Sequence, residues 1–449
     1  MTQMTVDCQP PCVFASLRHS ARLASLRLSV CLLAAACTAR GTSSEAGAAG
    51  PATVFDSTAD TIVARVAGEV PRAGVRRLRE EMRIAPAASD TSLFTEVAGF
   101  VVDRAGRVWV FDRPSSSLFL FGADGKLVRH VGREGGGPGE YKGINGIVVL
   151  GDTGLAIWDG GNARVSFLDS AGAFRTSWRV PGGFGTSEGL VTDRSGGLYL
   201  KNPVTPPREG EIIGRIGLVR PGPDGKIADS LVPPDLKVPR EVYVAVHVYS
   251  KDSRSQSSMT SAYAPNYYWA WHPGGFFVVA DGGKYEIILA RRSAKPIVIR
   301  RTSAPVPVSA GERDEERAAI TFSMRRTDPA WSWSGPPLPE TKAPLIGQYP
   351  LRGLFVSRDG RIWTSVAAPS ERIPDAELAP PRDPKAPVSH YRTPAVYEIY
   401  SADGRFLGRV ELPPRARLME ADGDLVWALV RDENDLPAVV RFRVEPGME

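Results

Sequence analysis

The sequence predicts an all-β fold, a six-bladed β-propeller built from four-stranded antiparallel blades. Three observations predict this fold. A unit of two strands and a tight turn recurs six times, 45 glycines and 38 prolines are spread along the 449 residues, and the sixth copy of the unit lacks a strand. Abundant glycine and proline favour many short elements over long helices.

The recurring unit is an apolar strand, a turn rich in aspartate and glycine, and a second strand that often carries tryptophan. Typical copies are GFVVDRAGRVWVFD (99–112) and GLFVSRDGRIWTSV (353–366), and a second hairpin follows each copy. Such turns between β-rich runs predict hairpins, so each repeat is expected to form a four-stranded meander. A two-sheet sandwich would not explain six matching copies. The expected blades cover about 94–135, 144–181, 187–232, 266–301, 351–412 and 416–446.

The sixth blade needs a fourth strand, because its last predicted strand is 438–445. The segment 76–85, with Leu78–Ile84 at its centre, precedes the first blade and is expected to close the ring. The stretch TIVARV (61–66) is expected to add an outer strand. Ser309 and Glu312 have the spacing of a capping box, which predicts one inserted helix near 309–326.

Residues 1–37 have the features of a secretory signal peptide. Arginines precede the short apolar run LSVCLLAAAC, which has too few residues to span a bilayer. The end of this run resembles the lipobox of bacterial lipoproteins and implies acylation of Cys37, although Ala34 stands where leucine is usual. An ordinary signal cleaved after an alanine is the alternative. Residues 38–52 are expected to form a flexible tether, and 53–449 the propeller domain.

Cysteine usage and charge exclude several classes of function. All four cysteines lie within the first 37 residues, so the mature chain has no thiol for disulfides, zinc sites or nucleophilic catalysis. The 55 basic and 50 acidic residues nearly balance, and no basic block stands out. We therefore expect no nucleic-acid partner, and contact with a membrane only through the lipid anchor.

The stretch from FVVDRAGRVWVFD to LFLFGADGKLVRHVGREGGGPGEY resembles bacterial six-bladed β-propeller proteins related to NHL repeats. The resemblance covers roughly residues 76–445 and is strongest in the first two blades. Many members of that family are exported lipoproteins. The resemblance therefore implies a fold and a periplasmic or cell-surface location, and little about chemistry.

The glycine-rich stretch GREGGGPGEYKG (132–143) raises the question of a phosphate-binding loop. Pro138 stands where a P-loop needs lysine, and strand residues rather than a helix follow. We interpret the stretch as the crossover between the first two blades, with glycines for unusual backbone angles. Arg133 and Tyr141 stay candidates for ligand contact.

All long insertions are predicted on one face of the propeller, opposite the Asp-Gly turns. They cover 201–215, 233–265, 302–350 and 368–394. Binding residues usually lie on loops of a rigid scaffold, so this face is the predicted binding face. Trp331 and Trp333 are candidates for stacking on a sugar or an aromatic ligand, and packing is the alternative.

Alignment of the innermost strands predicts a ring of side chains at the mouth of the central channel. Asn145, Glu188 and Arg352 each precede an aligned glycine, and blade four places Asn266 or Tyr267 there. The oxygens of Asn145 and Glu188 suit calcium, as in six-bladed lactonases. Arg352 adds a positive charge, so an Arg352–Glu188 pair or a site for an anionic ligand is the simpler interpretation.

The leading prediction is an exported binding module for a protein, peptide or saccharide on the insertion-bearing face. The alternative is a calcium-dependent, lactonase-like hydrolase or lyase at the channel mouth, with Glu188 and Asn145 as ligands. No cofactor is expected under the leading prediction. No His-Glu-x-x-His motif is present in the sequence, and no catalytic residue is predicted.

Overall fold

The computed structural model describes the chain from residue 51 to residue 448 apart from short gaps. The gaps are 69, 71–74, 87–93, 95, 153, 181–188, 208–213, 240, 251–252, 348–352, 379–380 and 382. The expected signal peptide, with Cys37, lies outside the described residues, as does nearly all of the expected tether. All structural statements below concern the unit that begins at Ala48.

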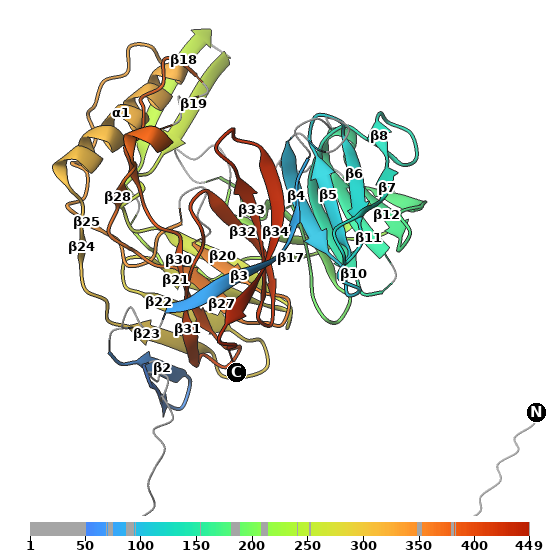
Figure 1. The fold of residues 1–449 in the computed structure, drawn as a ribbon, viewed down its shortest axis with the longest axis horizontal. Helices are drawn as coiled ribbons and strands as arrows, with labels where there is room; N and C mark the ends of the chain where they lie inside the picture. Colours follow the sequence, from blue (N-terminus) through green and yellow to red (C-terminus); the bar gives the residue numbers. More distant parts are fainter. Residues whose placement is uncertain are drawn as a thin grey trace, which may run out of the picture. The chain divides into compact units, whose positions relative to one another are not determined.

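Six four-stranded blades lie in five sheets, because the fifth and sixth blades belong to one eight-stranded sheet. Neighbouring strands within each blade run antiparallel (Figure 1). The first three blades are β4 (Val97–Val102), β5 (Val108–Asp112), β6 (Ser117–Phe121) and β7 (Leu127–Val131); β10 (Ile144–Leu150), β11 (Gly154–Asp159), β12 (Arg164–Asp169) and β13 (Phe174–Arg179); and β14 (Leu190–Thr192), β15 (Leu198–Pro203), β16 (Ile216–Pro221) and β17 (Ile227–Leu231). The last three are β20 (Tyr267–His272), β21 (Phe276–Asp281), β22 (Glu286–Ala290) and β23 (Ile297–Arg301); β26 (Leu354–Val356), β27 (Ile362–Ser365), β30 (Val396–Tyr400) and β31 (Phe406–Glu411); and β32 (Ala416–Asp422), β33 (Leu425–Arg431), β34 (Pro437–Glu445) and β3 (Val75–Ile84).

The hydrophobic core consists of six apolar clusters, each between two neighbouring blades. Trp109 packs with Leu155 between the first and second blades, and Trp427 packs with Val110 between the sixth and the first. Four further clusters join the remaining pairs of neighbours. Because the last cluster leads back to the first blade, the blades form a closed ring, as the sixfold repeat predicts.

Strand β3 closes this ring. It pairs antiparallel with β34, with Leu78 opposite Val444 and Ile84 opposite Val439. Its first two residues also pair parallel with β31 of the fifth blade. Figure 1 shows β3, coloured blue, beside the red strands of the C-terminal part. The prediction that an N-terminal strand completes the sixth blade is confirmed.

Two further N-terminal strands widen the fourth blade. β2 (Ile62–Val66) pairs parallel with β23, and β1 (Thr53–Ser57) pairs antiparallel with β2. The expected outer strand at 61–66 therefore lies on blade four. Short paired segments complete the strands: β8 (Arg133–Glu134), β9 (Glu140–Tyr141), β24 (Val306–Pro307), β25 (Thr341–Lys342), β28 (Glu371–Arg372) and β29 (Tyr391–Arg392).

The insertions between blades three, four and five build a separate cluster that we call the insertion lobe. It consists of the hairpin β18 (Tyr243–Ser250) and β19 (Ser253–Met259), the helix α1 (Ala310–Thr327) and residues 328–338. Ser309 caps α1 and exchanges hydrogen bonds with Glu312, so the predicted capping box and helix are confirmed. Ile320 and Met324 of α1 are fully buried against β18. Among the described residues, no helix is long and apolar enough to cross a membrane.

Candidate functional site

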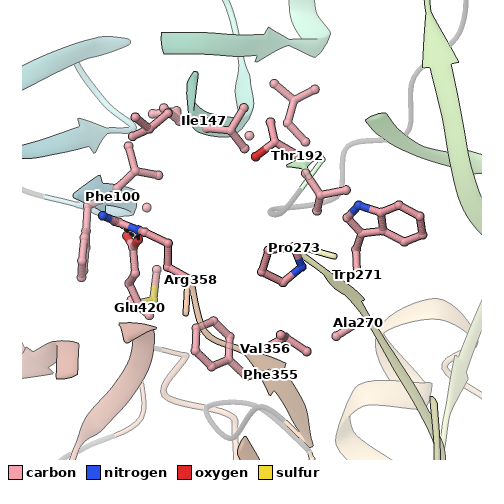
Figure 2. A pocket seen from close by; sticks show the side chains of 18 of the residues that line it. Phe100, Ile147, Thr192, Ala270, Trp271, Pro273, Phe355, Val356, Arg358 and Glu420 are labelled. Atoms are coloured by element: carbon pink, nitrogen blue, oxygen red, sulfur yellow. Dashed lines mark hydrogen bonds and ion pairs between the residues drawn. The ribbon is translucent and has the colours of Figure 1, made fainter. Parts of the chain in front are cut away.

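A cavity of about 850 Å³ lies on the axis of the ring. The innermost strand of every blade contributes to its wall, from β4, β10 and β14 through β20, β26 and β32. Figure 2 shows the labelled side chains around this space, with Arg358 and Glu420 against each other. The cavity is therefore a product of ring closure, because no single blade could enclose it.

Glycines at the start of the inner strands let neighbouring blades approach closely. A β-carbon on Gly146 would lie 2.7 Å from the backbone nitrogen of Leu190 in the next blade. At this contact the N–H of Gly189 donates to the carbonyl of Asn145 at 2.7 Å. Two of the aligned glycines, Gly146 and Gly189, thus lie at a backbone contact between blades two and three.

The wall of the cavity is mostly apolar. Aromatic and aliphatic side chains share it, among them Phe100, Phe111, Trp269, Trp271, Phe355, Val101, Ile147, Val149, Leu190, Val356 and Met419. Ten polar or charged side chains also contribute to the described lining, among them Asn145, Thr192 and Ser357. A cavity of this size and character suits a ligand that buries most of its own surface.

Three arginines line the cavity where the inner strands turn. Arg104, Arg194 and Arg358 come from blades one, three and five. Each arginine is the second residue of a four-residue turn that ends in glycine. In each turn the N–H of this glycine donates to the carbonyl of the first residue, at 3.0 Å in 103–106, 3.1 Å in 193–196 and 2.9 Å in 357–360. Those glycines have positive φ angles of 76°, 83° and 97°, which glycine adopts without strain. Because the turns are equivalent, the three side chains occupy equivalent places in alternate blades, and we call them the arginine triad.

Arg358 forms an ion pair with Glu420 across blades five and six. Its Nε donates to Glu420 Oε1 at 3.0 Å, and its Nη2 donates to Glu420 and to the carbonyl of Val102. Glu420 Oε2 accepts from the N–H of Val102 at 3.0 Å. Burial raises the pKa of Glu420, although the Arg358 guanidinium acts in the opposite direction. The pair therefore joins blades five, six and one at the cavity wall.

Cationic side chains outnumber carboxylates in the described lining, and carboxylates outside the lining pair with some of them, as Glu96 does with Arg113 at 3.4 Å. Five cationic side chains and two carboxylates contribute to the described lining. One of these carboxylates, Asp193, accepts from Ser195, Gly197 and Tyr199 within its own turn. Burial alone would raise the pKa of Asp193, but these hydrogen bonds hold it below its usual value. Lys201 Nζ lies 5.3 Å from the centre of the Trp269 ring.

Of the residues predicted at the channel mouth, Asn145 lines the cavity. Its Oδ1 lies so close to Gly160 that a β-carbon there would meet it at 2.3 Å. Asn266 and Tyr267 do not contribute to the described lining: Asn266 Oδ1 accepts from the N–H of Tyr267, whose hydroxyl donates to the carbonyl of Pro234 at 2.6 Å. Burial raises the pKa of Tyr267 to about 12.

Two other predicted residues, Glu188 and Arg352, lie outside the described residues. Their predicted ion pair, and the calcium site that depends on Glu188, stay predictions. Among the described residues, no group of three or more His, Cys, Asp or Glu side chains is arranged to hold a metal ion.

The glycine-rich stretch forms the crossover between β7 and β10, as interpreted from the sequence. Arg164 donates to the carbonyls of Gly136, Gly137 and Glu140, so these oxygens are already engaged. Tyr141 is fully buried, and Arg133 is an exposed partner of Glu140 at 2.7 Å. Neither candidate side chain contributes to the described cavity wall.

Trp331 and Trp333 lie in the insertion lobe. The Nε1 of Trp331 donates to the carbonyl of Val244 at 2.9 Å, and its ring is buried. The ring of Trp333 packs against Tyr243, with ring centres 4.5 Å apart. Both tryptophans therefore make packing contacts, which the sequence analysis gave as the alternative to stacking on a ligand. None of the described cavity-lining residues comes from 233–265 or 302–347.

The arginine triad was missed by the sequence reasoning, although a signal for it was present. The turns DRAG (103–106), DRSG (193–196) and SRDG (357–360) carry arginine at the same position. The predicted ring of side chains came from residues at the start of the inner strands, whereas these arginines lie in the turns that follow those strands. An alignment of the turns would have found the three arginines.

Comparison with known proteins supports the same architecture. Residues 89–166 match a family model described as a 6-bladed beta-propeller. The chain is a six-bladed β-propeller. The comparison of this propeller with curated proteins found no match.

Several solved structures are similar to this propeller at low sequence identity. A Bacteroides fragilis protein to which export has been attributed is 12% identical, with 86% of this chain and 99% of that chain covered and a TM-score of 0.44. Virginiamycin B lyase from Staphylococcus aureus is 11% identical, with coverage of 82% and 99% and a TM-score of 0.37. Regucalcin from Agrobacterium tumefaciens, a calcium-binding protein, is 14% identical, with coverage of 80% and 92% and a TM-score of 0.34.

Proposed function

We propose that this propeller is an exported binding protein that takes a small, largely apolar ligand into its central cavity. The observation that carries the proposal is the cavity of about 850 Å³, to which all six inner strands contribute. Ligand pockets are typically about 300–1,000 Å³, mostly apolar, and supplied with a few polar groups. The volume of the cavity lies within this range, and its wall combines an apolar surface with polar and charged side chains.

The cavity is favoured over the insertion-bearing face as the main binding site. The prediction for that face depended on side chains such as Trp331 and Trp333, which are engaged in packing within the insertion lobe. A protein, peptide or saccharide partner on that face therefore has less support than a small ligand on the axis. No observation favours the calcium-dependent hydrolase or lyase over a binding protein.

The proposed location is the periplasm or the cell surface, with Cys37 acylated. Support comes from the sequence, in which basic residues precede a short apolar run that ends in AAAC. Release of a Cys37→Ser variant from the membrane fraction would be the expected result. Retention of that variant in the membrane fraction would contradict lipidation.

The binding proposal can be tested by isothermal titration calorimetry of the mature protein with 2-naphthamide, a neutral aromatic probe. Thr192→Phe places a ring into the cavity from β14 and is expected to weaken binding at least about 10-fold, because the volume is occupied. Val128→Phe on β7 is the matched control, since Val128 is exposed on an outermost strand. Equal binding by both variants, or no binding to the parent protein, would overturn the proposal.

A further inference from the structure

The arginine triad makes one end of the cavity wall chemically different from the rest. We infer that the ligand is an amphiphilic anion, an aryl or acyl carboxylate, whose charged group lies against the triad while its apolar part fills the cavity. The inference rests on the proposed function and specifies the substrate class of the same site.

The placement of the triad supports a single shared binding position. Arg104, Arg194 and Arg358 occupy equivalent turns of alternate blades, and all three line the same cavity. Three guanidinium groups around one axis can approach a single anion from different sides. Arginine is well suited to this role because its planar fork of donors matches a carboxylate.

The present partners of two members of the triad, Arg194 and Arg104, leave capacity for an anion. Arg194 Nη2 donates to the backbone carbonyls of Asp359 at 2.8 Å and of Arg358 at 3.4 Å, and no ion pair of Arg194 with a carboxylate is present within the described part of the chain. The ion pair of Arg104 with Asp152, at 3.1 Å, is 68% and 76% exposed at its two side chains. Exposed pairs of this kind contribute little to stability, so a ligand can compete for Arg104.

The apolar wall next to the triad determines the other half of the ligand. Ile147, Val356 and Trp271 line the same cavity as the three arginines. Figure 2 shows these side chains and Arg358 around one open space. A small inorganic anion would leave this apolar surface in contact with water, and a neutral hydrocarbon would leave the guanidinium group of Arg194 without a carboxylate. An amphiphilic anion satisfies both surfaces.

Calorimetry with two probes of the same shape tests the inference. The parent protein is expected to bind 2-naphthoate at least about 10-fold more tightly than 2-naphthamide at pH 7. Arg194→Gln should reduce this preference to within about 3-fold, because it weakens the binding of 2-naphthoate much more than that of 2-naphthamide. Arg129→Gln is the matched control, because Arg129 on β7 also donates to a backbone carbonyl, that of Ala171 at 3.0 Å, and lies away from the cavity.

The outcomes separate this inference from the proposal on which it rests. If both probes bind with equal affinity, the cavity is a ligand site and the anion inference is wrong. If Arg194→Gln weakens both probes equally, Arg194 has a structural role, and the inference is likewise overturned. If neither probe binds the parent protein, the proposed function itself fails.

Discussion

Two arginine–glutamate pairs of similar chemistry occupy very different surroundings in this propeller. Arg301 and Glu398 lie between blades four and five, with side chains 3% and 1% exposed. Arg358 and Glu420 lie at the cavity wall, with side chains 31% and 17% exposed. The first pair is enclosed by protein, whereas the second faces space that a ligand can enter.

The enclosed pair has all of its carboxylate oxygens engaged. Glu398 Oε2 accepts from Arg301 at 2.8 Å and from the hydroxyls of Tyr285 and Tyr400, and Oε1 accepts from Arg409 at 2.5 Å. Burial raises the pKa of both tyrosines well above 10, so both hydroxyls keep their protons and donate. Such a network holds two blades together and offers nothing to a ligand. The comparison shows that exposure and remaining capacity, rather than residue type, distinguish a binding group from a structural one.

The largest expected effect is at the enclosed pair. Glu398→Ala leaves the guanidinium groups of Arg301 and Arg409 without their carboxylate and should lower the free energy of unfolding by about 3–5 kcal/mol. Urea unfolding followed by circular dichroism measures this change. The matched control is Glu286→Ala, because Glu286 pairs with the half-exposed Arg300 at 2.7 Å and should lose less than about 1 kcal/mol. Similar losses for the two variants would contradict the distinction.

A second enclosed group, His272, should make stability depend on pH. Its Nε2 donates to the carbonyl of Gly360 and its Nδ1 accepts from Gly274, and burial lowers its pKa from 6.5 to about 4. The neutral ring therefore contributes stability that is present above pH 6.5 and is lost as the pH falls toward 4. Between pH 7 and pH 4 the parent protein should lose about 3 kcal/mol more than His272→Gln. Parallel pH profiles of the two proteins in urea unfolding would contradict this assignment.

A smaller effect on stability than at Glu398 or His272 is expected at the open pair, Arg358–Glu420. Glu420→Gln keeps the shape of the side chain and should lower the free energy of unfolding by only about 1–2 kcal/mol, because Arg358 retains water and the carbonyl of Val102 as partners. The same change removes a competitor for Arg358, so the affinity for 2-naphthoate should rise several-fold. Calorimetry measures the affinity. A large loss of stability without any gain in affinity would show that this pair resembles Arg301–Glu398.

The fold could be predicted from the sequence because its determinants are local and repeated. Each turn and each pair of strands has its own signal, such as DRAG in the first blade and the capping box at Ser309. The closing strand followed from the missing strand of the last blade. Its second, parallel pairing with β31 could not be predicted, because the strand missing from the last blade requires only the pairing with β34.

The cavity and its arginines could be predicted less well from the sequence than the fold. Whether an arginine is engaged or available depends on distances between blades, such as that between Arg358 and Glu420, 62 residues apart in the chain. The same limit applies to tryptophan, since Trp331 belongs to a packed lobe and Trp271 to the cavity wall. The residue type indicates which interactions a side chain can make. Whether that side chain lies in a packed interface or at the cavity wall depends on how the blades pack together.

The most direct test of the cavity as the ligand site is crystallographic. Crystals grown with 6-bromo-2-naphthoate allow the bromine to be located by its anomalous scattering. The account predicts one strong peak inside the space enclosed by the six inner strands, with the carboxylate toward the arginine triad. A peak on the insertion lobe, or none in the cavity at a concentration that saturates binding in solution, would contradict it.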